Sequence, residues 1–191
     1  QQHVVQYLLQ SGHVDLMRHD VLGQTPLSHA AKAGHVPAMA LLLRRGANSE
    51  SKDKDGRTAL SLAAGGGHHQ AVMELANRKA DILSEDDAGR QPMHWACKSG
   101  NVDTVAFLIG EGADVAARDK SKSTPLTWAA SAGKVAVVEF LLGQGAAIDW
   151  KDGEDRTPIS RAAGNGHLDV VKCLHSKGAD IKIPDNRGAL P

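Results

Sequence analysis

Histidine is the residue type that most suggests chemistry here, because the chain has ten histidines in 191 residues and histidine serves both as a metal ligand and as a general base. His35, His68 and His167 each follow a glycine directly and stand at multiples of 33 residues from one another, which indicates a structural role at one repeated position. The adjacent pair His68 and His69 would not face one direction on a helix. No cysteine or carboxylate recurs beside it at ligand spacing, so the sequence predicts no metal site and no cofactor.

The three residue types of a hydrolytic triad occur close together in the sequence, as Ser28, His29 and Asp20. Ser28 and His29 are neighbours on one expected helix, so their side chains point about 100° apart, which does not suit proton transfer between them. An aspartate equivalent to Asp20 also recurs along the chain, which favours a structural role. The run 65–67 of three glycines is not followed by Gly-Lys-Ser/Thr, so it predicts a loosened helix end rather than a phosphate-binding loop. The sequence thus predicts a protein that is not an enzyme.

A period of 33 residues organises the chain. Thr-Pro-Leu or a variant of it begins at residues 25, 58, 91, 124 and 157, with an aspartate five residues before each start and a glycine nine residues after it. We divide the chain, as one domain of residues 1–191, into units one to five at residues 20–52, 53–85, 86–118, 119–151 and 152–184, with partial repeats at 1–19 and 185–191. Because the chain begins and ends within a repeat, we expect it to be a piece of a longer array.

Each unit is expected to contain two short helices. Threonine followed by proline is typical of a helix start, with the hydroxyl as N-cap and proline at the first helical position. The pattern predicts first helices near 25–33, 58–66, 91–99, 124–132 and 157–165, and second helices near 35–45, 68–78, 101–111, 134–144 and 167–177. The polar remainder of each unit should form a hairpin-like finger. Helices this short are unstable alone, so the sequence predicts an all-α solenoid stabilised by stacking of unit on unit.

These residues resemble the ankyrin repeat. The shared pattern is Asp-x-x-Gly-x-Thr-Pro-Leu-x-x-Ala-Ala, followed by Gly-His, Leu-Leu and Gly-Ala-Asp, and it covers essentially the whole chain. The resemblance implies an ankyrin-repeat solenoid of stacked helix-turn-helix units, in which partners commonly bind the concave groove made by the fingers and the first helices. The family's usual histidine after Thr-Pro-Leu is present only as His94. The wording Thr-Pro-Leu-Ser/Thr-Trp-Ala-Ala also resembles arrays in fungal multidomain proteins, some of which carry nucleotide-binding switch domains.

Composition argues against several classes of partner. The 22 basic residues balance the 22 acidic ones, so charge does not draw the chain to nucleic acid or to an anionic membrane. No apolar run approaches the 18 residues of a membrane-spanning helix. Cys97 and Cys173 are too few for a disulfide framework, lie too far apart to pair, and are expected to be buried apolar residues. These features predict a monomer in the cytosol or the nucleus.

Tryptophan and arginine occur at positions that the repeat does not fix. Directly before the alanine pair of each unit stand His29, Leu62, Trp95, Trp128 and Arg161, and directly before the threonine position stand Gln24, Arg57, Arg90, Ser123 and Arg156. Stacking should place each set in a row of about 10 Å per step. Because tryptophan and arginine are enriched at the energetic centres of interfaces, we predict that the partner-binding residues are Trp95, Trp128, Arg161, Arg90 and Arg156. The alternative is that tryptophan here is scaffold that packs on its neighbour.

The predicted function is a non-catalytic protein–protein interaction scaffold. Its partner would be a protein or peptide segment that is extended, apolar and acidic, bound on the concave side of residues 86–165. We expect both tryptophans to be partly exposed there, with apolar side chains of the segment against them and its carboxylates against the arginines. The alternative is a regulatory or substrate-recruiting segment of a larger multidomain enzyme or nucleotide-switch protein. A narrower version is a methylated lysine held between Trp95 and Trp128 by cation–π contacts, for which the sequence offers no third wall.

Unit two departs from its siblings at two positions. Glu74 stands where the other units have Leu41, Phe107, Phe140 and Cys173, and Lys79 stands where they have Gly46, Gly112, Gly145 and Gly178. A non-glycine residue in left-handed backbone costs about 1 kcal/mol or more. We therefore predict that Lys79 is strained and that unit two has the weakest interfaces of the central units.

Overall fold

A computed structural model describes residues 15–191, and residues 1–14 of the predicted partial repeat 1–19 lie outside the described residues. The first helices of the five units are α2 (Pro26–Lys32), α4 (Ala59–Gly65), α6 (Pro92–Ser99), α8 (Pro125–Ser131) and α10 (Pro158–Gly164). The second helices are α3 (Val36–Arg44), α5 (His69–Asn77), α7 (Val102–Gly110), α9 (Val135–Gly143) and α11 (Leu168–Ser176). Residues 15–191 contain no strand, so the predicted all-α solenoid and the placement of its ten helices are confirmed.

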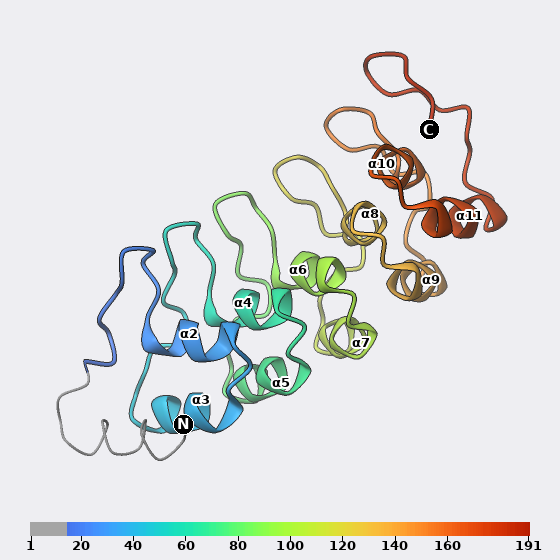
Figure 1. The fold of residues 1–191 in the computed structure, drawn as a ribbon. Coiled ribbons are helices and arrows are strands. Elements are labelled where there is room, and N and C mark those ends of the chain that lie inside the picture. The colour runs from blue at the N-terminus through green and yellow to red at the C-terminus, as the bar shows by residue number, and fades with distance from the viewer. Residues whose placement is uncertain (1–14) are drawn as a thin grey trace.

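The units stack in chain order (Figure 1), with the fingers projecting beyond the row of first helices and the second helices forming the opposite side. Each finger is joined to the one before it by a backbone hydrogen bond. Asp87 N–H, for example, donates to the Asp55 carbonyl at 3.0 Å, and Lys120 N–H donates to the Ala88 carbonyl at 2.9 Å. These hydrogen bonds therefore connect the fingers into one row that runs along the direction in which the units stack.

Threonine caps the first helix of four units, as predicted. The Oγ1 atoms of Thr25, Thr58, Thr124 and Thr157 accept the backbone N–H of the residue three positions later. That residue is a serine or threonine whose hydroxyl, in three of these units, also contacts the threonine, at 3.0 Å for Ser28 on Thr25. In unit three the residue is His94, whose Nδ1 accepts the Gln91 backbone N–H at 3.1 Å. Where the family's histidine is missing, the threonine hydroxyl thus caps the helix, and in three units it is paired with a second hydroxyl.

The core is formed by both rows of helices: each first helix contributes one large apolar residue and small residues, and each second helix contributes buried residues such as Leu75, Leu108 and Leu141. Leu27, Leu60, Met93, Leu126 and Ile159 are each at most 1% exposed. Cys97 is fully buried as predicted, and burial raises the pKa of its thiol. Cys173 is only half-buried, contrary to the prediction, because its repeat position is half-buried in the sibling units as well. Both cysteines are free thiols.

The expectation that unit two packs most weakly is wrong for its first helix. Every residue of α4 except Gly65 is buried. A Cβ atom added to Gly65 would lie 3.5 Å from Cε3 of Trp95, at ordinary contact distance, so the next unit packs directly over this helix end. On α5, Glu74 Oε1 pairs with Arg78 Nε at 2.7 Å. The ion pair neutralises the Glu74 carboxylate, which stands at a position that is apolar in the sibling units.

Lys79 has left-handed backbone with φ 64°, as predicted, and the sibling glycines Gly46, Gly112, Gly145 and Gly178 are left-handed too. We expect Lys79→Gly to raise the free energy of unfolding by about 1 kcal/mol, because it relieves this strain. Urea unfolding measures the change. The matched control is Gln144→Gly one repeat position earlier, where φ is −88° and glycine should destabilise by about 0.5–1 kcal/mol. A gain in both variants, or in neither, would contradict the prediction.

Candidate protein-binding surface

The residues directly before the alanine pairs contact the aspartate that stands nine residues earlier in the finger. Trp95 Nε1 donates to Asp86 Oδ2 at 3.1 Å, and Trp128 Nε1 donates to Asp119 Oδ2 at 2.9 Å. The same contact is made by Arg161 Nε to Asp152 Oδ2 at 2.6 Å and by His29 Nε2 to Asp20 Oδ2 at 2.8 Å. A nitrogen donor at this position thus ties each first helix to its finger, except in unit two, where Leu62 has none. The constant nine-residue spacing was the sequence signal for this contact.

Trp95 and Trp128 form one aromatic pair on the concave face, which is the face formed by the fingers and the first helices. Their ring centroids are 5.8 Å apart and their planes are inclined by 51°. Both residues are half-buried, so the expectation that they remain partly exposed is met. Arg90 lies over Trp95 at 4.5 Å, and Lys98 Nζ lies 5.4 Å and 5.5 Å from the two rings. A methylated lysine between the rings would have to displace these cations.

The predicted arginines are not free for carboxylates of a partner, which corrects the sequence expectation. Arg90 Nε pairs with Asp86 at 2.8 Å, Arg161 Nη2 pairs with Asp152 at 2.6 Å, and Arg156 pairs with Asp152 and Glu154. Their side chains are only 23–25% exposed. The aspartate four residues before Arg90 and Arg156 already neutralises them, so these arginines hold the fingers rather than await a ligand.

Asp53 and Asp152 are buried finger carboxylates held in their charged form. Burial opposes ionisation of Asp53, but hydrogen bonds from the Arg57 backbone and side chain outweigh it, so the pKa of Asp53 is lowered from its usual 3.8. Burial likewise opposes ionisation of Asp152, and hydrogen bonds from Glu154 and Arg156 N–H, together with the Arg161 charge, lower the pKa of Asp152. These carboxylates therefore stabilise the fold only while they are ionised.

We expect the free energy of unfolding to fall as the pH drops below about 4. A carboxyl with a lowered pKa in the native state binds fewer protons there than in the unfolded chain, so acid favours unfolding. The contribution is fully present above the unfolded-state pKa and is lost as the pH falls through the lower native value. Urea unfolding between pH 3 and pH 7 measures this dependence. Asp53→Asn should flatten the acid limb, and an unchanged slope in that variant would contradict the assignment.

The histidines have structural contacts. His68 Nε2 lies 3.0 Å from the Lys32 carbonyl, and His167 Nε2 lies 3.0 Å from the Ser131 carbonyl, so each links its unit to the first helix of the unit before. His94 is buried, and burial lowers its pKa against the opposing effect of the Asp119 carboxylate. Ser28 turns into the core toward Thr25 while His29 faces Asp20. The serine and histidine of the imagined triad therefore do not meet.

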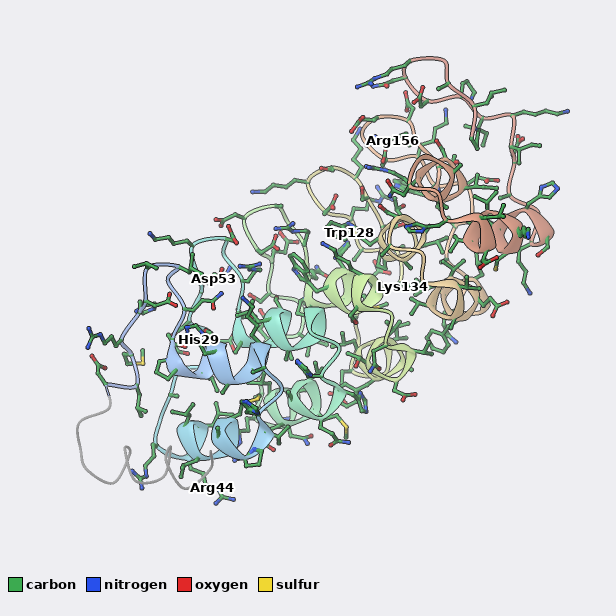
Figure 2. The ribbon with its side chains drawn as sticks, viewed as in Figure 1. His29, Arg44, Asp53, Trp128, Lys134 and Arg156 are labelled. Carbon is green, nitrogen blue, oxygen red and sulfur yellow. The ribbon has the colours of Figure 1, made fainter. Side chains whose placement is uncertain are left out.

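A hollow of about 480 Å³ opens on the concave face beside Trp95. Leu62, Gly65 and Gly66 contribute its apolar lining, and Lys32, Arg57, Lys98 and Lys134 are the basic residues around it. A smaller hollow of about 170 Å³ lies on the far side of Trp128 and includes Ser131 and Arg161. Figure 2 places His29, Asp53, Trp128 and Arg156 on the side of the fingers and first helices, with Arg44 on the opposite side beyond α3. The larger hollow spans units one to four, so it begins before the predicted region 86–165.

Residues 15–191 lack two other kinds of feature. No three histidine, cysteine, aspartate or glutamate side chains gather there in an arrangement that could hold a metal ion. Of the helices in the same residues, none has the length and apolar character to span a membrane. The hollows in this part of the chain include the two beside the tryptophan pair and one of about 340 Å³ at the first finger, which includes Asp20 and His29.

Comparison with known proteins gives the family. A model of ankyrin repeats in three copies matches residues 39–119 and 111–185, and a model of ankyrin repeats in many copies matches residues 8–68. No curated protein matches the chain. The matches span most of the sequence and coincide with the stacked units and their fingers, so the chain belongs to the ankyrin repeat family.

Proposed function

We propose that this chain is a protein-interaction module that binds an extended segment of a partner protein along its concave face. Ankyrin repeats generally bind proteins and are typically non-catalytic. The observation that carries the proposal is the Trp95–Trp128 pair, two large aromatic residues in mutual contact that stay half-exposed between two hollows. Two free thiols are compatible with a reducing compartment, and we propose the cytosol or the nucleus as its location.

The geometry of the pair favours tight recognition. Covering a tryptophan removes a large apolar area from water, and each such anchor contributes about 2 kcal/mol or more at an interface centre. Asp86 and Asp119 hold the indole N–H groups, so the rings are oriented before a partner arrives and lose little freedom on binding. Arg90, which is paired with Asp86 and lies over Trp95, supports this orientation.

The test must remove the indoles without freeing the buried aspartates. The chain supplies the substitutions, because His29 and Arg161 occupy the same repeat position and contact their own aspartates. We therefore pair Trp95→His with Trp128→Arg. Peptides selected from a random 12-residue display library on the wild-type chain should bind this double variant at least about tenfold more weakly. Its melting temperature should stay within about 4 °C.

The matched control is Trp150→Ala. Trp150 belongs to a finger, where its Nε1 donates to the Lys122 carbonyl at 2.8 Å and Arg118 lies 3.9 Å from its ring, and it lines neither hollow. This variant should bind the selected peptides as the wild type does. Equal binding of those peptides to the double variant and to the wild type would refute the proposal.

A further inference from the structure

The larger hollow contains positive charge that the fold does not neutralise. None of its lining residues is acidic. Arg57 is engaged with Asp53 at 2.9 Å and with Asp55 at 2.7 Å. Lys32, Lys98 and Lys134, in contrast, have no carboxylate within ion-pair distance in the described part of the chain. The three lysines, rather than the predicted arginines, are the cations available to a ligand.

The repeat spaces two of these lysines regularly around an apolar centre. Lys32 and Lys98 occupy the same repeat position in units one and three, and Gly65 occupies it in unit two. Since Gly65 has no side chain, the hollow stays open over Leu62 and against the ring of Trp95. Two helix-packing steps separate the lysine positions by about 20 Å. A peptide in the polyproline II conformation rises about 3.1 Å per residue and points every third side chain to the same side, so it covers that distance in about six residues.

We propose that this lysine-rimmed hollow binds an acidic segment of a partner protein, a conclusion that rests on the proposed function and gives the partner its chemical class. A large apolar side chain of the segment lies over Leu62 and Gly65 against Trp95. Carboxylates about three residues to either side of it meet Lys32 and Lys98, and a further carboxylate can reach Lys134. The charges match, the apolar centre lies between them, and the spacing of three residues is that of one segment in the polyproline II conformation.

Charge on the surrounding fingers favours a short acidic peptide over a nucleic acid. The fingers of units one to three carry the exposed carboxylates Asp20, Asp55 and Asp87. A long polyanion that crossed the hollow would meet these groups, and the whole chain has a net charge of zero, whereas nucleic-acid binding draws on many phosphate contacts. Three lysines around one hollow suit two or three carboxylates.

The probe is a fluorescent nine-residue peptide with a central phenylalanine, a glutamate three residues to each side of it, and serine and glycine elsewhere. Fluorescence anisotropy should show it binding at least about fivefold more tightly than the analogue with glutamine in place of both glutamates, with the difference shrinking at high salt. Lys32→Gln with Lys98→Gln should weaken binding of the acidic peptide about fivefold. Lys172→Gln is the matched control, because Lys172 is exposed on α11 and lies outside the hollow, and it should change nothing.

A second pair of variants tests the shape. Gly65 ends helix α4 and its added Cβ would make only ordinary contact with Trp95, so Gly65→Leu fills the hollow without backbone strain. It should weaken the acidic peptide at least about tenfold. Gly164→Leu changes the same repeat position in unit five, where nothing lies within 4 Å of the added Cβ, and should leave binding unchanged.

Three results would overturn the inference. They are equal affinity for the glutamine analogue, undiminished binding to Gly65→Leu, or tighter binding of a 12-nucleotide oligodeoxythymidylate, which would make this a nucleic-acid site. Failure of the inference is distinguishable from failure of the proposed function. Suppose that the library peptides bind the Trp95→His, Trp128→Arg chain more weakly than the wild type but bind the lysine variants equally well. The concave face is then still a binding surface, and only the acidic class of its partner is refuted.

Discussion

Replacing Asp86 with alanine is expected to lower the free energy of unfolding by about 3–5 kcal/mol. The carboxylate of Asp86 has no solvent-exposed surface. It accepts hydrogen bonds from Arg90 Nε at 2.8 Å, from Trp95 Nε1 at 3.1 Å, and from the backbone N–H groups of Ala88 and Arg90 at 3.0 Å each. Alanine removes every acceptor at once and leaves a guanidinium largely covered by protein without its counter-ion. The loss is large because the unpaired donors cannot all reach water.

Two variants separate this effect from a general loss of charge. Asp87→Ala removes the neighbouring carboxylate, which is exposed, and should change the free energy of unfolding by no more than about 0.5 kcal/mol. Asp86→Asn keeps an acceptor for the backbone N–H groups but loses the charge, so its cost should lie between the two. Urea unfolding followed by circular dichroism measures all three. A loss below about 1 kcal/mol for Asp86→Ala would show that the finger aspartate is dispensable.

The helices could be predicted from the sequence because their signals are local. A capping threonine, a proline at the first helical position and apolar residues at spacings of three and four lie within one unit. The 33-residue period repeats the apolar spacing in all five units and the threonine and the proline in four units each. Lys79 could be assigned left-handed backbone for the same reason, since four siblings have glycine there and φ at Lys79 is 64°. Comparison between the units thus supplied the backbone conformation at Lys79, which unit two alone would not have revealed.

The chemistry of the candidate site was only partly predictable. Trp95 and Trp128 were found because they differ between units, but their hydrogen bonds to the finger aspartates depend on how a finger folds back over its helix. The pairing of Arg90 with Asp86 had a visible signal, since arginine follows the aspartate by four residues in three units. Counting these arginines as free charges ignored that signal. The ion pairs of these arginines are the reason that the acidic partner is now proposed to meet the lysines of the larger hollow.

The larger hollow was not predicted, because it is open where Gly65 and Gly66 have no side chains. Gly65 and Gly66 suggested a loosened helix end when considered within their own unit. In the stacked structure Gly65 faces the ring of Trp95, Gly66 faces His68, and both leave open space beside Leu62. A glycine's effect on a surface depends on which neighbours surround it, and those neighbours come from the adjacent units, 33 residues away on each side.

The row of linked fingers gives the second large effect, which is expected for Gly56→Ala. Gly56 has φ +75°, where alanine is strained by about 1 kcal/mol or more. An added Cβ would lie 2.7 Å from the backbone nitrogen of Asp87, which donates to the Asp55 carbonyl. The clash therefore weakens the hydrogen bond between two fingers as well. We expect a total loss of about 2–4 kcal/mol in the free energy of unfolding, measured by urea unfolding.

Gly188→Ala is the matched control, because Gly188 occupies the repeat position of Gly56 in the partial repeat 185–191. Its φ is +79°, and nothing lies within 4 Å of an added Cβ. The substitution should cost no more than the backbone strain of about 1 kcal/mol. Unit four already tolerates a side chain here, since Lys122 has φ 58° and the residue facing it in the next finger is Gly153. Asp87→Gly should accordingly restore part of the stability lost in Gly56→Ala. If Gly56→Ala and Gly188→Ala cost the same, the close approach of the fingers does not contribute to stability.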